Sequence, residues 1–117
     1  MRLTYVKVVE EIPPYLVVTL DGEKYGLGDD DGFIYTSCDM DAIYECGDDD
    51  YFVIVLEKDG KYGFFFDESH YIEPTYDAFI LDANGDIHLK LDGVYGIIEA
   101  DGTEFREVSQ EESLLDK

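Results

Sequence analysis

One sequence unit recurs three times along the chain, and this recurrence limits the possible fold more than any other feature. Each copy has an Asp-Gly pair followed closely by a Tyr-Gly pair: Asp21-Gly22 with Tyr25-Gly26, Asp59-Gly60 with Tyr62-Gly63, and Asp92-Gly93 with Tyr95-Gly96. The Tyr-Gly pairs lie 37 and then 33 residues apart, a spacing typical of structural repeats. The chain is therefore expected to consist of three similar structural units.

The residues between these pairs favour short antiparallel strands. Ten Tyr and seven Phe, with many Val and Ile, favour strands, and Asp-Gly favours tight hairpin turns because glycine accepts a positive φ. We expect an all-β fold of three repeats, each a meander or stack of short antiparallel hairpins, in a single domain over 1–117. The expected repeats cover about 3–36, 39–73 and 76–105, and a tail covers 106–117.

Several segments add detail to this expectation. Residues 51–56 are apolar without alternation, which is typical of a strand covered on both faces, so the middle repeat is expected at the centre of the core. A fourth strand of the first repeat is expected over 33–36, and Asn84-Gly85 predicts a type I′ hairpin. In the tail, Ser109 and Glu112 have the spacing of a capping box. A short helix over about 109–116, docked by Leu114 and Leu115, is expected there, with a frayed tail as the alternative.

One stretch resembles a known repeat family. Residues 60–67, Gly-Lys-Tyr-Gly-Phe-Phe-Phe-Asp, and residues 72–79, Ile-Glu-Pro-Thr-Tyr-Asp-Ala-Phe, resemble the WG repeat, also called the KWG repeat. That family has Gly-Lys-Trp-Gly, an aromatic or aliphatic run and Asp, then Ile-Pro-Pro-x-Tyr-Asp. The resemblance covers most of 1–105, with Tyr25, Tyr62 and Tyr95 at the Trp positions. It implies a bacterial origin, a β-rich stack and an interaction or scaffold module. The three tyrosines are expected to be buried at equivalent positions.

No motif for catalysis or for a cofactor is recognisable. His70 and His88 are expected in a loop and on a polar strand face, both in solvent, and neither has neighbours at metal-ligand spacing. Cys38 and Cys46 lie among acidic residues, which disfavour a reactive thiolate. Two reduced thiols are preferred, and a disulfide between them is the alternative. We therefore expect no enzyme activity, no cofactor and no metal centre.

Two acidic loops, at 28–32 and 48–50, raise the question of calcium. An EF-hand needs Asp at alternate positions, Gly at the sixth position and Glu at the twelfth. Asp29-Asp30-Asp31-Gly32 does not keep that register. Weak cation binding to a carboxylate-rich surface is expected, and a weak calcium binder is a distant alternative function.

The distribution of charge is the most informative feature for function. Acidic residues outnumber basic ones 29 to 8, the net charge is −21, and no Lys or Arg occurs between Tyr25 and Glu57. Such a surface repels nucleic acid and anionic membranes and attracts basic proteins. The alternative is an acidic face that keeps a β-protein soluble and blocks edge pairing. Without a recognisable signal peptide or membrane-spanning stretch, we expect a cytoplasmic monomer that binds neither nucleic acid nor membrane.

Two classes of function follow from this charge. The first is a non-enzymatic inhibitor or immunity-type protein that covers a basic surface of a nucleic-acid-processing partner, such as a toxin nuclease or a defence enzyme, with carboxylates in place of phosphates. The second is a repeat scaffold whose charge serves solubility. The residues expected to bind the partner combine carboxylates with nearby aromatic rings. They are Asp29, Asp30, Asp31, Tyr35, Asp39, Asp41, Tyr44, Glu45, Asp48, Asp49, Asp50 and Tyr51.

Overall fold

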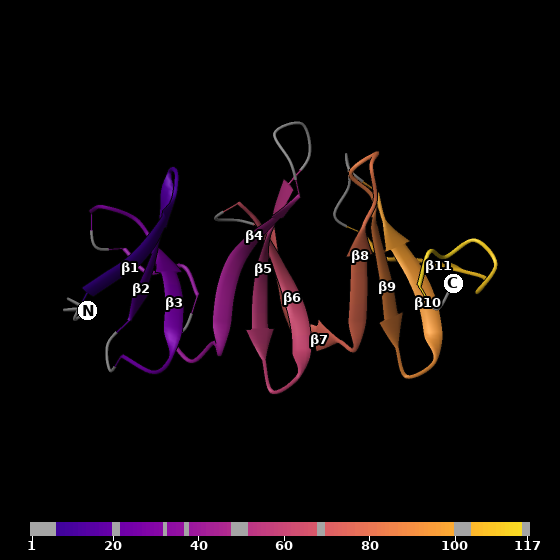
Figure 1. Ribbon diagram of the computed structural model, residues 1–117, viewed down its shortest axis with the longest axis horizontal. Helices are drawn as coiled ribbons and strands as arrows, with labels where there is room; N and C mark the ends of the chain where they lie inside the picture. The colour runs from indigo at the N-terminus through magenta and orange to yellow at the C-terminus, as the bar shows by residue number, and fades with distance from the viewer. Residues whose placement is uncertain are drawn as a thin grey trace.

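Three antiparallel β-sheets follow one another along the chain in the computed structural model, which describes residues 7–19, 22–31, 33–36, 38–47, 52–67, 70–99 and 104–115. The sheets lie in a row along the longest dimension of a 47 × 28 × 21 Å molecule (Figure 1). The predicted all-β fold class is therefore confirmed. Within the described ranges there is no helix, and so none long and apolar enough to cross a membrane.

Each sheet is a simple meander in which neighbours in sequence are neighbours in space. The first sheet contains β1 (Lys7–Ile12), β2 (Tyr15–Thr19) and β3 (Tyr25–Gly28). The second contains β4 (Ala42–Gly47), β5 (Phe52–Lys58), β6 (Lys61–Asp67) and β7 (His70–Tyr76). The third contains β8 (Ala78–Leu81), β9 (Ile87–Leu91), β10 (Val94–Ile98) and β11 (Arg106–Val108).

The Tyr-Gly pairs occupy the same register position in all three sheets. Gly26, Gly63 and Gly96 pair with the fully buried residues Val18, Leu56 and Leu89 of the preceding strand. On the other side of each glycine the chain passes so closely that a Cβ atom would overlap it. The overlap is with Cys38 in the first sheet, with the backbone of Ile72–Pro74 in the second and with the Phe105 ring in the third. The glycine of the repeat is therefore explained by close approach of the next segment.

The three repeat tyrosines are half-buried rather than fully buried. Tyr25 packs against the core between the first two sheets, and Tyr62 packs against the core between the second and third. Tyr95 lies in the last sheet, where the ammonium group of Lys90 sits 5.3 Å from its ring centroid. The expectation of equivalent positions is confirmed, whereas the expected burial is only partial.

Two hydrophobic cores separate the three sheets, and the middle sheet contributes to both. Ile54 and Leu56 of β5 point into the first core, whereas Val53 and Val55 point into the second. All four are at most 6% exposed. Alternate residues of a strand face opposite sides of a sheet, so this division places β5 between the two cores. The central position predicted from the apolar run is confirmed.

Two similar polar contacts join consecutive sheets; we call each of them a clasp. In the first clasp, the carboxylate of Asp41 binds the Lys24 ammonium group and accepts a hydrogen bond from the N–H of Asp59 at 2.8 Å. In the second, Asp77 binds Lys61 and accepts a hydrogen bond from the N–H of Asp92 at 3.1 Å. Each aspartate thus ties the lysine before one repeat tyrosine to the hairpin turn of the next sheet.

Those two hairpin turns have the backbone that the Asp-Gly signal predicts. Asp59 and Asp92 have φ of 54° and 51°, and the glycine after each also has a positive φ, as a type I′ turn requires. The Asn84-Gly85 turn differs from its prediction. Only Gly85 has a positive φ there, and the Asp82 carboxylate accepts hydrogen bonds from the N–H groups of Asn84 and Asp86, so a longer loop replaces the type I′ turn.

The segment after β3 is less regular than expected. Residues 33–36 form no strand. Isolated bridges join Gly28 with Ile34 and Tyr25 with Met40, and the carbonyl of Leu27 accepts the N–H of Tyr35 at 2.8 Å. The bridge of Tyr25 to Met40 has the same place as the pairing of Tyr62 with Tyr76 and of Tyr95 with Val108. In the first sheet the chain therefore runs where a fourth strand would lie, but it does not form the continuous hydrogen bonding of a strand.

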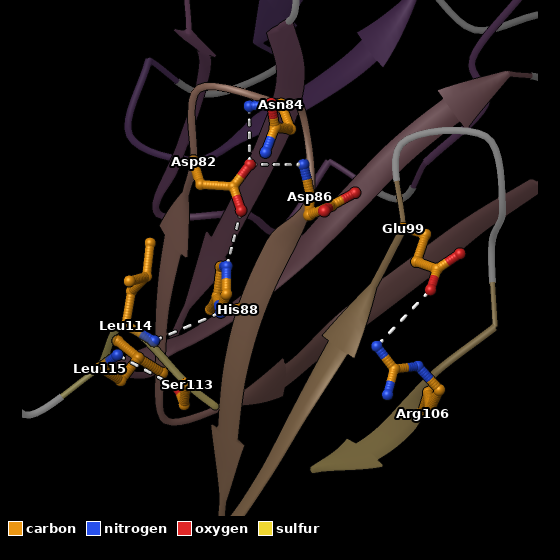
Figure 2. Close-up of polar contacts among 9 residues, drawn as sticks. All are labelled: Asp82, Asn84, Asp86, His88, Glu99, Arg106, Ser113, Leu114 and Leu115. Atoms are coloured by element: carbon orange, nitrogen blue, oxygen red, sulfur yellow. Dashed lines mark hydrogen bonds and ion pairs between the residues drawn. The ribbon is translucent and has the colours of Figure 1, made fainter. Parts of the chain in front are cut away.

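The C-terminal segment covers the outer side of the third sheet without forming the expected helix. Ser109 accepts the N–H of Glu112 as a capping residue would, at 3.3 Å, but the turn then stops. The N–H of Leu114 binds Nδ1 of His88 at 3.3 Å, and the N–H of Leu115 binds the Ser113 hydroxyl at 3.1 Å (Figure 2). These bonds occupy the donors that a helix would need. Leu115 is buried, whereas Leu114 is 44% exposed, so only one of the two predicted docking residues docks.

Candidate functional site

The loop after β3 is organised by the carboxylate of Asp29. Its Oδ1 accepts hydrogen bonds from the N–H groups of Asp31 at 3.0 Å and Phe33 at 3.1 Å, and its Oδ2 accepts one from the Tyr35 hydroxyl at 2.5 Å. The hydrogen bond from Tyr35 is the largest reason that the pKa of Asp29 lies below its ordinary value. Asp29 therefore shapes the loop, while Asp30 and Asp31 keep their side chains in solvent.

Five aromatic side chains lie beside this loop, and we call them the aromatic patch: Tyr15, Phe33, Tyr35, Phe65 and Tyr71. Phe33 contacts Tyr35 with ring centroids 5.1 Å apart, Tyr35 contacts Phe65 at 6.1 Å, and Phe65 contacts Tyr71 at 6.1 Å. Phe33 is 63% exposed and Tyr71 is 40% exposed, although Phe65 between them is buried. The patch thus runs from the loop of the first sheet to β7 of the second, with an exposed ring at each end.

Negative charge is concentrated at one end of the aromatic patch. The carboxylate oxygens of Asp29, Asp30 and Asp31 lie within 4.8 Å of one another. Oxygen ligands of this kind suit a hard cation, but one of the three carboxylates is already used by the loop and by Tyr35. The arrangement favours attraction of a positively charged group over a closed metal cage.

Asp39 and Asp41, two more of the predicted partner-binding residues, lie at the junction of the first two sheets. Asp39 binds the Lys58 ammonium group at 2.6 Å, and this hydrogen bond is the main reason that the pKa of Lys58 is raised. Asp41 forms the first clasp, and its pKa is lowered chiefly by Lys24. A hollow of about 270 Å³ adjoins Asp39 and Lys58, and its lysines already bind carboxylates of the chain. These contacts give both aspartates a place in the fold.

Tyr44 and Glu45 point to opposite sides of β4. Tyr44 packs with the second core, so the middle sheet separates it from Tyr35, which packs with the first. Burial, followed by the nearby Glu57 carboxylate, raises the pKa of Tyr44 to about 12. Glu45 is exposed. Asp48, Asp49, Asp50 and Tyr51 lie outside the described residues.

The structure therefore divides the predicted set. It gathers the aspartates of the loop at 29–31 with Tyr35, assigns Asp39 and Asp41 to the sheet junction, and separates Tyr44 from both groups. Sequence reasoning missed Phe33 and Tyr71, the two exposed rings of the aromatic patch. The only available signal was the aromatic residue that directly follows the acidic loop at 28–32.

The five basic side chains that the structure describes all contact groups of the same chain. Lys24, Lys58 and Lys61 bind aspartates; Arg106 lies 3.5 Å from Glu99 (Figure 2); and Lys90 sits over Tyr95. The chain has 29 Asp and Glu against 8 Lys and Arg, so these contacts leave a large excess of negative charge. The anionic surface is thus weakly compensated from within the chain.

The histidines differ from each other, which corrects one expectation. His70 is exposed as predicted, although it begins β7 instead of lying in a loop, whereas His88 is only 5% exposed. Its Nε2 lies 2.8 Å from Oδ2 of Asp82 (Figure 2), and its Nδ1 accepts the Leu114 N–H. Both ring nitrogens are engaged, so His88 anchors the C-terminal segment. Burial tends to raise the pKa of Asp82, but hydrogen bonds from His88 and two N–H groups outweigh it and leave the pKa lowered.

No disulfide joins the two cysteines, so the expectation of two thiols is confirmed. Cys38 lies against Gly26 in the first sheet, and Cys46 packs with the second core. Comparisons of the chain with models of known families, with curated proteins and with solved structures found no match.

Proposed function

We propose that the chain is a non-enzymatic acidic binding protein that covers a basic surface of a protein partner. The observation that carries the proposal is the exposure of Phe33 and Tyr71 on the aromatic patch together with the exposed carboxylates of Asp30 and Asp31 in the adjoining loop. Aromatic residues are enriched in protein interfaces, and carboxylates around them select a positively charged partner. The partner class that fits best is a nucleic-acid-processing enzyme, such as a toxin nuclease or a defence enzyme, because its substrate is also a polyanion.

The charge of the chain supports this proposal in two ways. A net charge of −21 on 117 residues makes the folded chain repel itself, which is a cost that a binding role would explain. The described basic side chains are also engaged within the chain, so little positive charge is left to weaken attraction of a partner. Inhibition by an immunity-type complex, with carboxylates in place of phosphates, would use both properties.

A second function is a repeat scaffold of the WG type, in which the charge serves solubility. The equivalent Tyr-Gly pairs and the two clasps favour it, because they describe a stack that neighbouring sheets stabilise. This function needs no basic partner, so the dependence of binding on salt separates the two proposals.

The first prediction concerns that dependence. The immobilised chain is exposed to lysate of its source organism, and each captured protein is measured by surface binding at rising salt. We expect a basic protein whose association rate falls steeply, because the Debye length shrinks from ~10 Å at 0.1 M to ~3 Å at 1 M salt. Asp30→Asn with Asp31→Asn should slow its association, whereas Glu111→Gln with Glu112→Gln should not. Capture of only neutral proteins, insensitive to salt, would favour the scaffold.

A further inference from the structure

We propose that the aromatic patch and the adjacent loop at 29–31 form the docking surface for an arginine-bearing segment of the partner, with Phe33 where the patch meets the loop. The inference rests on the proposed function and adds to it a position on the molecule and a chemistry of recognition.

Phe33 is the first observation behind this inference. It is 63% exposed, more than any other large hydrophobic side chain among the described residues. Its backbone N–H binds Asp29, and its ring lies 5.1 Å from the ring of Tyr35, whose hydroxyl binds the same carboxylate. A ring held in this way loses little freedom when a partner covers it, which is the property of an interface anchor.

The extent of the patch is the second observation. Contacts continue from Phe33 through Tyr35 and Phe65 to Tyr71, which is 40% exposed on β7. The surface therefore crosses from the first sheet to the second and presents a ring at both ends. It suits an extended segment of a partner better than a single small ligand.

Charge complementarity selects the occupant. An arginine guanidinium group stacks on an aromatic face and also binds carboxylates. The N–H of Phe33 binds Asp29, whose carboxylate lies within 4.8 Å of the exposed carboxylates of Asp30 and Asp31. No Lys or Arg of this chain occurs between Tyr25 and Glu57, and Lys24 and Lys58 are bound to aspartates. A second copy of the chain, with the same charge of −21, and a nucleic acid would both be repelled.

The test, which is the second prediction, uses a fluorescent arginine–glycine peptide as the probe, with a lysine–glycine peptide of equal charge as its control. Affinity is measured by fluorescence polarisation for the intact chain and its variants. We expect the arginine peptide to bind more tightly. Phe33→Ala should weaken its binding about threefold to tenfold and remove the preference for arginine, because a cation–π contact contributes about 0.5–2 kcal/mol. Asp30→Asn with Asp31→Asn should weaken both peptides.

Two matched controls make the result decisive. Phe52 is another exposed phenylalanine, at 52%, and Phe52→Ala should change affinity less than twofold. Glu111→Gln with Glu112→Gln removes the same charge as the loop variant and should also have little effect. Loss of binding in Phe52→Ala instead of Phe33→Ala would overturn this surface and keep the acidic binding protein. Absence of salt-sensitive binding of either peptide would overturn both, and saturable calcium binding lost in the loop variant, without peptide binding, would assign the loop to a cation.

Discussion

The same register positions carry different residues at the two junctions between sheets and in the third sheet. At each junction a lysine directly precedes the repeat tyrosine. The aspartate just before the first strand of the next sheet binds this lysine and also binds the next hairpin turn. In the third sheet Val94 has the position of the lysine and Ser109 that of the aspartate, as the pairings of Tyr95 with Lys90 and Val108 indicate. The clasp residues are thus present at the two described junctions and replaced in the third sheet.

The end of the stack has its own stabilising contacts. The side of the third sheet that carries Tyr95 and His88 receives the segment 109–115, where the first two sheets receive a neighbouring sheet. The face that carries the repeat tyrosine thus packs against the next sheet in the first two sheets, and in the third it is bound by the segment 109–115 through His88. Repeat proteins commonly need such terminal caps because an end sheet cannot bury its outer face alone.

The third prediction, with the largest expected effect, compares glycines of the middle and last sheets. In Gly63→Ala the new Cβ would overlap the backbone of Ile72–Pro74, which cannot move without breaking β7. We expect about 3 kcal/mol of lost stability in denaturant unfolding. Gly96→Ala would overlap only the ring of Phe105, which is 38% exposed and can rotate away, so about 1 kcal/mol is expected. Equal losses would show that the two sheets are packed alike.

The fourth prediction tests the cap. His88→Ala removes the acceptor of the Leu114 N–H and leaves the largely buried Asp82 carboxylate without its ring partner. We expect a loss of about 2–3 kcal/mol and faster amide exchange at Leu114. His70→Ala, at the exposed histidine, should stay within about 0.5 kcal/mol of the parent chain. An unchanged exchange rate at Leu114 in His88→Ala would mean that the segment docks without this anchor.

The fifth prediction has the smallest effect and concerns the clasps. Lys24 and Lys61 hold the pKa values of Asp41 and Asp77 below their ordinary value of 3.8. Because the pKa is lowered in the folded state, the stabilisation is complete above the ordinary pKa of the unfolded chain and is lost as the pH falls through the lowered pKa. Asp41→Asn with Asp77→Asn should therefore lower Tm by a few degrees at pH 7. In this variant Tm should also decrease less than in the parent chain when the pH is lowered from about pH 5 to pH 2.

The control for this variant removes the same charge elsewhere. Glu107 in β11 and Glu104 just before that strand are both exposed and take no part in a clasp. Glu104→Gln with Glu107→Gln should keep the acid-dependent fall of Tm measured for the parent chain. A parallel fall in all three proteins would remove the clasps as a source of acid sensitivity.

Much of the fold could be predicted because its signals are local. Asp-Gly turns fix the hairpins, and the unbroken apolar run through Val53–Leu56 identifies the strand that two cores cover. The burial of His88 could not be read in this way. Alternation along β9 places it on the opposite face from Ile87 and Leu89, but only the distant segment 109–115 decides whether that face meets water.

The candidate site was less predictable than the fold. Acidic residues are so common in this chain that charge by itself does not separate Asp41, which joins two sheets, from Asp30 and Asp31, which face solvent. A signal did exist, since Asp41 and Asp77 each precede an alanine and each lies after a lysine-tyrosine pair at similar distance. The exposure of Phe33 depends on the path of the loop around Asp29, which no local pattern reveals.

The meander order of the sheets has a consequence for folding during synthesis. The strands of each sheet are consecutive in sequence, so each sheet can form once its own stretch of chain has left the ribosome. It buries its second face when the next sheet packs against it. The first sheet can form before the third has been synthesised. The middle sheet therefore packs first against the first sheet and later against the third. The order of translation and the order of assembly therefore coincide, and a chain interrupted between sheets would end on an uncovered core.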